Sequence, residues 1–207
     1  MTKRRARGEL TRVQVLEATL RLLAREGPRG VTHRAVAAEG GTSVRATTYY
    51  FASREQLLGE ALVHYADTAI GRIDALTATL GALPKERAAL REKIADLLAL
   101  SVLSNLGDRT GLIAEYELIL ETARNPTLED TYRRWQERLE CLIRHFALEL
   151  GSDAPEEDTR IVLAVLRGVE MEALSRPSRE AGFAELRQTM GHLLAGLEAG
   201  MLARRAG

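Results

Sequence analysis

The sequence predicts an all-α protein of about nine helices, in which a three-helix N-terminal domain precedes a larger helical bundle. Ala, Leu, Arg and Glu dominate its 207 residues, while aromatic residues make up 4% and prolines number 5, a mixture that favours helices. Apolar side chains recur every three or four residues along most of the chain, which is the spacing of one helix face. A sheet is not expected, because no second alternating stretch exists that could pair with the single strand-like one.

The first two helices are bounded by capping and stop signals. The first is expected over residues 11–26, from a capping box that pairs Thr11 with Gln14 to a stop at Gly27. The second is expected over residues 33–39, with its apolar residues facing inward.

The strand-like stretch lies in the segment 42–51, between Gly40-Gly41 and a second capping box that pairs Ser53 with Gln56. On propensity alone, Thr-Thr-Tyr-Tyr-Phe favours a strand. The turn before it and the helix cap after it leave room only for a short helix of about eight residues, so a third helix is predicted.

The rest of the chain is expected to be helical almost throughout. A long helix follows the cap at Ser53 and closes at Gly81 and Pro84. Later helices are expected over residues 84–105, 109–123, 127–150, 155–175 and from Ser178 to near the C-terminal end. The only division is expected near residue 55, which gives a domain of residues 1–55 and a second of residues 56–207.

The formal net charge of zero hides an asymmetry along the chain. Residues 1–55 hold 11 Lys and Arg against 5 Asp and Glu, a balance of +6, so the remainder has a balance of −6. A basic head on an acidic body suits a protein whose first quarter faces nucleic acid. A solvated basic tail would have the same composition.

Several classes are excluded by composition and motif. A single cysteine, Cys141, leaves no internal disulfide or Cys-based zinc site and fits a reducing compartment. No apolar stretch reaches the roughly 18 residues of a membrane span, and no apolar signal core follows the basic N-terminus. The four histidines lack metal-binding spacing, and no phosphate loop or nucleophile motif is present. We expect a cytoplasmic protein that is not an enzyme and has neither metal nor cofactor nor membrane partner.

The short helices and the glycine turn indicate a helix-turn-helix unit packed on the first helix. In such a unit the second helix of the pair enters the major groove, and the first lies across the backbone with its N-terminal amides toward a phosphate. Spacing alone is a weak signal, but together with the basic head it favours DNA binding.

The residues of this unit resemble the N-terminal motif of TetR-family (tetracycline-repressor-like) transcriptional regulators. The resemblance covers about residues 11–62 and rests on "VLEATLRLLAREG" and "VTHRAVAAEGGTSVRATTYYFASREQLLGEAL". Motif positions are taken by Thr32, Val36-Ala37, Gly40-Gly41-Thr42-Ser43, Tyr49-Tyr50-Phe51 and Ser53-Arg54-Glu55 with Leu57. The chain departs from the motif at Gly40 (usually Ala), at Thr48 (usually Tyr) and at Arg54 (usually Lys).

The resemblance implies a regulator that binds double-stranded operator DNA. The residues expected at the DNA are Thr32, His33, Arg34, Ser43, Val44, Arg45, Thr47, Thr48, Tyr49, Tyr50, Ser53 and Arg54. Arg45 could read a guanine through O6 and N7, or contact a phosphate only. One of Ala46 and Thr47 must face the first helix. Either Tyr49 or Tyr50 could donate a hydrogen bond from its hydroxyl to a phosphate. The basic residues from Lys3 to Arg7 are expected to be disordered and to add non-specific affinity.

The resemblance also implies a homodimer and an unknown small-molecule effector bound in the larger domain. Candidate effector contacts are polar groups amid apolar faces, although each is also compatible with ordinary packing: Tyr65, Glu115, Tyr116, Trp135, Arg138, Cys141, His145 and Glu170. A cavity-facing Glu115 or Glu170 would favour a cationic ligand. The expected dimer interface is an apolar stripe of Leu166, Phe183, Leu186, Met190, Leu193 and Leu197, which could instead pack within one chain.

The function expected from this interpretation is that of a repressor released from a palindromic operator by a small molecule. Two alternatives stay open. One is a helical module that binds protein rather than DNA, and the other is a dimeric regulator that senses no ligand.

Overall fold

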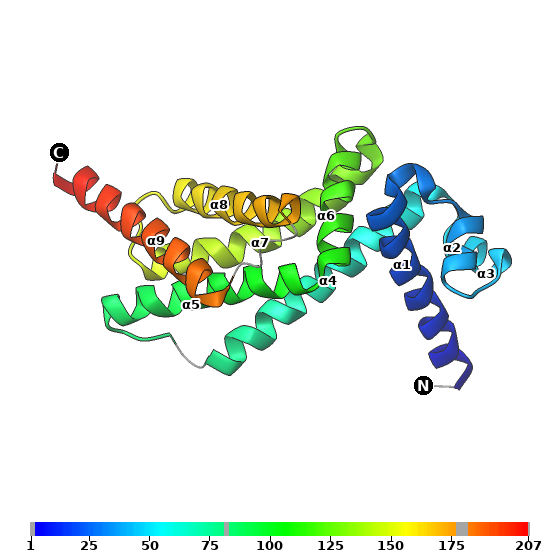
Figure 1. Cartoon of the computed structure of the whole chain (residues 1–207), viewed down its shortest axis with the longest axis horizontal. Helices are drawn as coiled ribbons and strands as arrows, with labels where there is room; N and C mark the ends of the chain where they lie inside the picture. The colour runs from blue at the N-terminus through cyan, green and yellow to red at the C-terminus, as the bar shows by residue number, and fades with distance from the viewer. Residues whose placement is uncertain (1–2, 81–82, 177–181, 207) are drawn as a thin grey trace. The chain divides into compact units, whose positions relative to one another are not determined.

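The computed structural model describes residues 3–80, 83–176 and 182–206, and it confirms the all-α class (Figure 1). The described helices are α1 (Lys3–Gly30), α2 (His33–Glu39), α3 (Val44–Tyr50), α4 (Arg54–Leu80), α5 (Arg87–Gly107), α6 (Arg109–Thr122), the 3₁₀ turn η1 (Pro126–Leu128), α7 (Glu129–Glu149), α8 (Pro155–Ser175) and α9 (Phe183–Ala206). These described stretches include no strand, and the segment with strand-like composition forms α3 as predicted.

The helices form two compact units. The first runs to Thr68 and also includes Asp108–Trp135, and the second comprises Ala69–Gly107 and the chain from Gln136 onward. The functional division near residue 55 stays a prediction.

The N-terminal helix differs from the prediction at both ends. It begins at Lys3 rather than at Thr11, and it includes the residues from Lys3 to Arg7 that were expected to be disordered. The Thr11 hydroxyl does not cap the helix but donates to the carbonyl of Arg7 inside it, at 3.0 Å. The predicted stop at Gly27 appears as a local break, with φ of 68°, before one last turn to Gly30.

Other boundaries shift by a few residues. The helix α5 begins at Arg87 rather than at residue 84, because the carboxylate of Glu86 accepts from the amides of Ala88 and Ala89 at 3.0 and 2.7 Å. The expected start of the last helix at Ser178 and the expected stop at Gly81 lie outside the described residues.

In the first unit, α1 packs against α2, α3 and α6. The core contains Leu16 and Leu23 of α1, Val36 of α2 and the ring of Phe51, all fully buried. The guanidinium of Arg12 lies over the Phe51 ring, 5.8 Å from its centroid. This packing holds the turn after α3 against α1.

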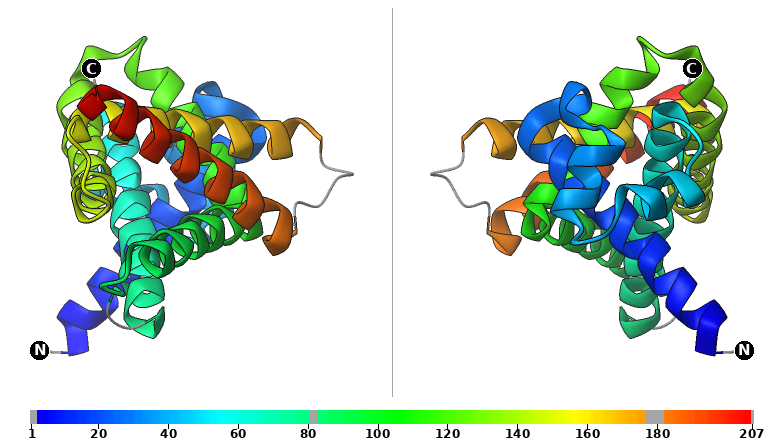
Figure 2. Two further views of the ribbon diagram at one scale, coloured as in Figure 1. Left: turned by 90° about the vertical axis from the view of Figure 1, so that its left-hand side faces the viewer. Right: turned by 90° about the vertical axis from the view of Figure 1, so that its right-hand side faces the viewer.

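In the second unit, α5 lies beside α9 and α8 (Figures 1 and 2). Their shared core includes Ile94, Leu98, Phe146, Val162, Leu186, Met190 and Leu194. Leu186 and Met190, expected at a dimer interface, are 2% and 0% exposed and belong to this core. Leu166, Leu193 and Leu197 are half-buried against the same cluster. Packing within one chain therefore already buries Leu186 and Met190, and the dimer interface stays a prediction.

Candidate nucleic-acid interface

Side-chain caps start α2 and α3, and two glycines, Gly40 and Gly41, form the turn between them. The hydroxyls of Thr32 and Ser43 accept from the amides of Ala35 and Ala46, each at 3.1 Å, and so start α2 and α3. Gly41 has a φ of 60°, in the left-handed region that favours glycine. These local interactions set the direction in which α3 leaves the turn.

One face of α3 points inward. Thr47 is 0% exposed, and its hydroxyl donates to the carbonyl of Val44 at 2.8 Å and approaches that of His33 at 3.4 Å. Of Ala46 and Thr47, it is therefore Thr47 that faces the interior, and Ala46 is half-buried. We remove Thr47 from the residues proposed to touch DNA, because a side chain in the core cannot reach a base.

The opposite face of α3 is open to solvent. Val44, Arg45, Thr48 and Tyr49 are all exposed, as is Ser43 just before the helix. Spacings of three and four place Arg45, Thr48 and Tyr49 on one side of the helix. The Thr48 hydroxyl already donates to the carbonyl of Val44 at 3.0 Å. We call Arg45, Thr48 and Tyr49 the outward face of α3.

The two tyrosines occupy different environments. Tyr49 is 80% exposed. Tyr50 is half-buried, and a Cβ added at Gly8 would lie only 3.2 Å from its hydroxyl, so this hydroxyl lies against α1. The two rings meet edge to face with centroids 5.1 Å apart. Tyr49 is thus the tyrosine that the fold presents to solvent.

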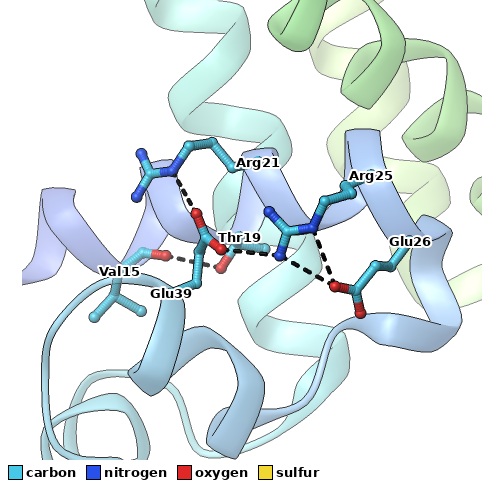
Figure 3. Close-up of polar contacts among 6 residues, drawn as sticks. All are labelled: Val15, Thr19, Arg21, Arg25, Glu26 and Glu39. Carbon is cyan, nitrogen blue, oxygen red and sulfur yellow. Dashed lines mark hydrogen bonds and ion pairs between the residues drawn. The ribbon is translucent and has the colours of Figure 1, made fainter.

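An ion-pair network joins α2 to α1 (Figure 3). Glu39 accepts from Arg21 and from Arg25, each at 2.9 Å, and Arg25 also donates to Glu26 at 3.1 Å. Hydrogen bonds from Arg21 and then Arg25 lower the pKa of the Glu39 carboxyl, while the bonds to Glu39 and Glu26 raise the pKa of Arg25. Beneath the network, buried Thr19 donates to the carbonyl of Val15 at 2.8 Å. The network links the end of α2 to α1.

Sequence reasoning missed this network, although part of its signal was present. Arg21 and Arg25 are four residues apart and so share one side of α1. Their partner Glu39 lies on another helix, and no local pattern identifies a partner so distant in sequence.

Arg54, expected at a phosphate, is engaged within the protein. Its guanidinium donates to the carbonyls of Pro28 and Val31 at 2.6 and 3.2 Å, and it lies 3.7 Å from the carboxylate of Glu121. The neighbouring Ser53 accepts from the amide of Gln56 at 3.1 Å, so the predicted cap at this position is present. Arg54 holds the end of α1 near α4, and we remove it from the proposed DNA contacts.

The remaining basic residues of the head divide into paired and unpaired groups. Arg12 pairs with Glu60, and Arg21, Arg25 and Arg54 are engaged as described above. Exposed Arg34 and Arg45 make no ion pair with any described residue. His33 beside Arg34 is half-buried, with its Nδ1 buried and lacking a partner among the described residues. Exposed Arg7 and Arg29 on α1 likewise make no ion pair with a described residue, so positive charge free to meet a phosphate or a guanine lies on α1, at the start of α2 and on α3.

The residues expected to contact an effector divide between the two units. Tyr65, Glu115, Tyr116 and Trp135 belong to the first unit, and Arg138, Cys141, His145 and Glu170 to the second. Tyr65, Glu115, Trp135 and Glu170 are buried, whereas Arg138, Cys141 and His145 are exposed. Glu170 accepts from the amide of Asn105 at 2.8 Å.

Hollows in the second unit differ in size and chemistry. The hollow inside its apolar core measures about 20 Å³, far below the roughly 300 Å³ of small-molecule sites. A surface cleft of about 140 Å³ lies between α8 and α9, and another of about 320 Å³ lies between α7 and α8.

Two properties of the described residues bear on other classes of protein. None of the helices there has a stretch long and apolar enough to cross a membrane. In the same part of the chain, no three His, Cys, Asp or Glu side chains gather so as to hold a metal ion.

A glycine turn between two short helices, with exposed Arg45 on the outer face of the second and exposed Arg34 near the start of the first, is typical of a helix-turn-helix DNA-binding regulator. Two family profiles match the chain: "Bacterial regulatory proteins, tetR family" over residues 15–61, and "Tetracyclin repressor-like, C-terminal domain" over residues 89–196. The second match alone spans more than half of the chain, so the protein belongs to the TetR family of transcriptional regulators. The predicted resemblance is confirmed, and members of this family are regulators rather than enzymes.

Solved structures agree with this assignment. The multidrug binding protein EbrR, in complex with imidazole, is 28% identical over 88% of each chain, with a TM-score of 0.62. A TetR-family member from Streptomyces coelicolor A3 is 28% identical over 88% of this chain and 97% of its own, with a TM-score of 0.66. A transcriptional regulator from Rhodococcus sp. Rha1 is 16% identical over 90% and 95%, with a TM-score of 0.71, and supports the fold alone. No curated protein sequence matches the chain.

Proposed function

We propose that this regulator is a homodimeric repressor that reads a palindromic operator with the outward face of α3 and leaves it when a small molecule binds. The observation that carries the DNA contacts is the exposed guanidinium of Arg45, which pairs with no described residue and lies one helical turn before exposed Tyr49, within the head that matches the family. A guanidinium free of carboxylates can bond O6 and N7 of a guanine, and a tyrosine hydroxyl can donate to a phosphate.

Each part of the head has a distinct role in this proposal. Arg45 reads a base, Ser43, Val44 and Thr48 line the groove, and Tyr49 bonds a phosphate. Thr32 and Arg34 meet the backbone at the start of α2. His33 and Ser53 stay as secondary candidates, because each is half-buried. Tyr50 is proposed to pack only, since its hydroxyl lies against α1. Operator binding requires the compartment that holds the chromosome, so the proposal includes a cytoplasmic location.

The proposed dimer uses the outer faces of α8 and α9 rather than the apolar stripe predicted from sequence. Most exposed described residues of α9 are small or polar, with two large apolar side chains and charges only near its ends: Phe183, Ala184, Glu185, Gln188, His192, Ala195, Gly196, Ala199, Leu202, Ala203 and Arg204. One side of α8 is similar, with exposed Ile161, Ala164, Gly168, Met171 and Ser175. Small residues let helices approach closely, so two copies could pack these faces together. A dimer places two α3 helices on half-sites about one DNA turn, roughly 34–36 Å, apart.

The effector is proposed to be a small organic cation. The structure of EbrR in complex with proflavin is 28% identical in sequence to this chain. The structure of EbrR in complex with ethidium is 27% identical. Buried Glu115 of the first unit and buried Glu170 of the second are each a carboxylate that could offset a buried positive charge. Binding would shift the population toward heads spaced wrongly for the operator. The alternative, a regulator without a ligand, is favoured by the small core hollow of the second unit.

The DNA proposal is tested with a duplex selected from a random library by the wild-type protein, at fixed salt. Arg45→Ala is expected to weaken binding by about 1–3 kcal/mol and to relax the sequence preference at one base pair. Arg133→Ala, which removes the same charge from exposed α7 surface, is the control and is expected to leave affinity unchanged. An Arg45→Ala protein that binds and discriminates like wild type would overturn the assignment of α3.

The effector proposal has its own measurement. Ethidium and proflavin are expected to raise the melting temperature and to release the selected duplex, and Glu115→Gln is expected to weaken both effects. Stabilisation without release would mean binding that does not regulate. If neither dye nor a wider set of organic cations stabilises the protein, the regulator without a ligand becomes the better description.

A further inference from the structure

A polar cleft of about 320 Å³ lies between α7 and α8, away from the helix-turn-helix residues in sequence and outside the apolar core of its unit. Its volume falls within the usual range for small-molecule sites. The lining side chains are charged or polar with one thiol: Glu137, Glu140, Cys141 and Arg144 from α7, and Glu156, Thr159 and Arg160 from α8. None of the DNA contacts proposed above uses these residues.

Thr159 in this cleft has a buried hydroxyl without a hydrogen-bond partner. The residue is 3% exposed, and no described atom bonds its Oγ1. Helical threonines commonly donate to the carbonyl four residues earlier, and Thr19 and Thr68 of this chain do so, each at 2.8 Å. A buried hydroxyl with no bond is unfavourable, so it favours a ligand that supplies an acceptor.

The charges of the cleft favour a ligand that carries both signs. Arg144 pairs with Glu156 across the two helices at 3.5 Å, while Arg160 makes no ion pair with a described residue. Its guanidinium is free to hold a carboxylate, which the Thr159 hydroxyl could also bond. Glu137 and Glu140 on α7 offer negative charge to an ammonium group.

The thiol adds a reactive group to this arrangement. Cys141 is the only cysteine of the chain, it is exposed, and it lies three residues before Arg144 on the cleft side of α7. A zwitterion held at the cleft would place its own atoms beside this sulfur. If that zwitterion is a small disulfide, its sulfur atoms would lie within reach of the Cys141 thiolate, which is a nucleophile.

We propose that the cleft binds a zwitterionic low-molecular-weight disulfide of the glutathione class and forms a mixed disulfide at Cys141. The Cys141 thiol loses its proton to solvent, and its thiolate attacks one sulfur of the bound disulfide. The old S–S bond breaks as the new one forms, and the second half leaves as a thiolate, so electrons balance without another oxidant. Arg160 and Thr159 hold carboxylates of the retained half.

The test compares two disulfides at two positions in the full-length reduced protein. Oxidised glutathione and uncharged hydroxyethyl disulfide are each added, and intact mass follows the modified fraction over time. The reference protein is Cys141→Ser with Leu148→Cys, since Leu148 is half-exposed on α7 and does not line the cleft. For each position, the rate with oxidised glutathione is divided by the rate with hydroxyethyl disulfide. We expect this ratio to be about tenfold higher at Cys141 than at position 148, which corresponds to the free energy of about one charge-assisted hydrogen bond. Equal ratios at the two positions would overturn the proposal.

Two substitutions separate binding in the cleft from simple exposure of the thiol. Arg160→Gln and Thr159→Val are each expected to lower the ratio toward that of the reference position while leaving the hydroxyethyl rate unchanged. Arg176→Gln removes the same charge from the far end of α8, where Arg176 pairs with Glu172 at 3.0 Å, and is expected to keep the wild-type ratio. An equal loss in Arg160→Gln and Arg176→Gln would show a general charge effect and sink the site. The hydroxyethyl rate and the melting temperature confirm that each variant folds.

Discussion

At the scale of single residues, neighbours in sequence have opposite environments. Thr47 is buried and Thr48 is exposed, and Tyr49 is exposed while Tyr50 lies against α1. On a helix, each step of one residue turns the side chain by about 100°, so a residue and its neighbour can have different environments. The proposed DNA contact therefore belongs to one tyrosine, and this can be measured.

Tyr49→Phe removes only the hydroxyl that is proposed to donate to a phosphate. We expect operator affinity to fall about tenfold, similarly for every DNA sequence, as for the loss of one hydrogen bond to a charged group. Tyr50→Phe is the matched control and is expected to bind as wild type. If Tyr50→Phe weakens binding and Tyr49→Phe does not, the assignment of the two tyrosines is reversed.

Glu39 is a second residue whose role can be tested, because its ion pairs make its effect depend on pH. Bonds from Arg21 and Arg25 lower its pKa in the folded state, so it stabilises the fold above the unfolded-state pKa of about 4.3 and loses this effect as pH falls through the lowered value. Glu39→Gln is expected to lower the urea midpoint at pH 7, with the difference from wild type shrinking below about pH 4.

The control for this measurement is Glu17→Gln, on the exposed surface of α1 with no ion pair to a described residue. It is expected to have a similar urea midpoint to wild type at both pH values. A Glu39→Gln deficit that stays constant down to acid pH would show that packing, and not the ion pairs, explains it.

At the scale of elements, caps and glycines decide where the helices of the head begin and end. Ser43 starts α3, Ser53 starts α4, and Gly41 makes the turn between α2 and α3. These signals are local, so the sequence predicted α2, α3 and the start of α4 closely. Prediction failed at α1 because no residue near Thr11 stops a helix, and the backbone remains helical back to Lys3.

The same substitution at two glycines is expected to have opposite effects. Gly41→Ala places a Cβ on a left-handed residue and is expected to lower the unfolding free energy by about 1–2 kcal/mol. Gly71→Ala, inside α4 with open space around it, is expected to raise it by about 0.5–1 kcal/mol. Denaturant titration of both variants checks the pair. Stabilisation by Gly41→Ala would contradict the turn geometry.

At the scale of the whole molecule, α9 has two different faces. Its apolar face packs inside its own unit with Met190 at the centre, and its exposed face is largely small and uncharged. The sequence identified the apolar stripe but not its partner, since burial by a helix of the same chain and burial by a second copy require the same pattern.

Ala195→Glu is expected to convert the proposed dimer to a monomer, because it puts charge into a closely packed helix face. Ser104→Glu, which adds the same charge to the exposed surface of α5, is expected to leave the dimer intact.

Met190→Ala is expected to lower the unfolding free energy by about 2–5 kcal/mol without dissociating the subunits. Sedimentation equilibrium in native buffer measures the assembly. If Met190→Ala dissociates the dimer and Ala195→Glu does not, the apolar stripe predicted from the sequence is the dimer interface.

The sequence by itself determined the helical class, the helix-turn-helix head and the family, because periodicity, caps and turn residues act over a few neighbouring positions. Tertiary structure decided which side of each helix faces inward, and therefore which arginines remain free. Arg54 and Arg45 look alike in the sequence, yet the first bonds the carbonyl of Pro28 and the second has no ionic partner among the described residues. That difference arises because ion pairs and hydrogen bonds join residues far apart in the chain, and only packing brings them together.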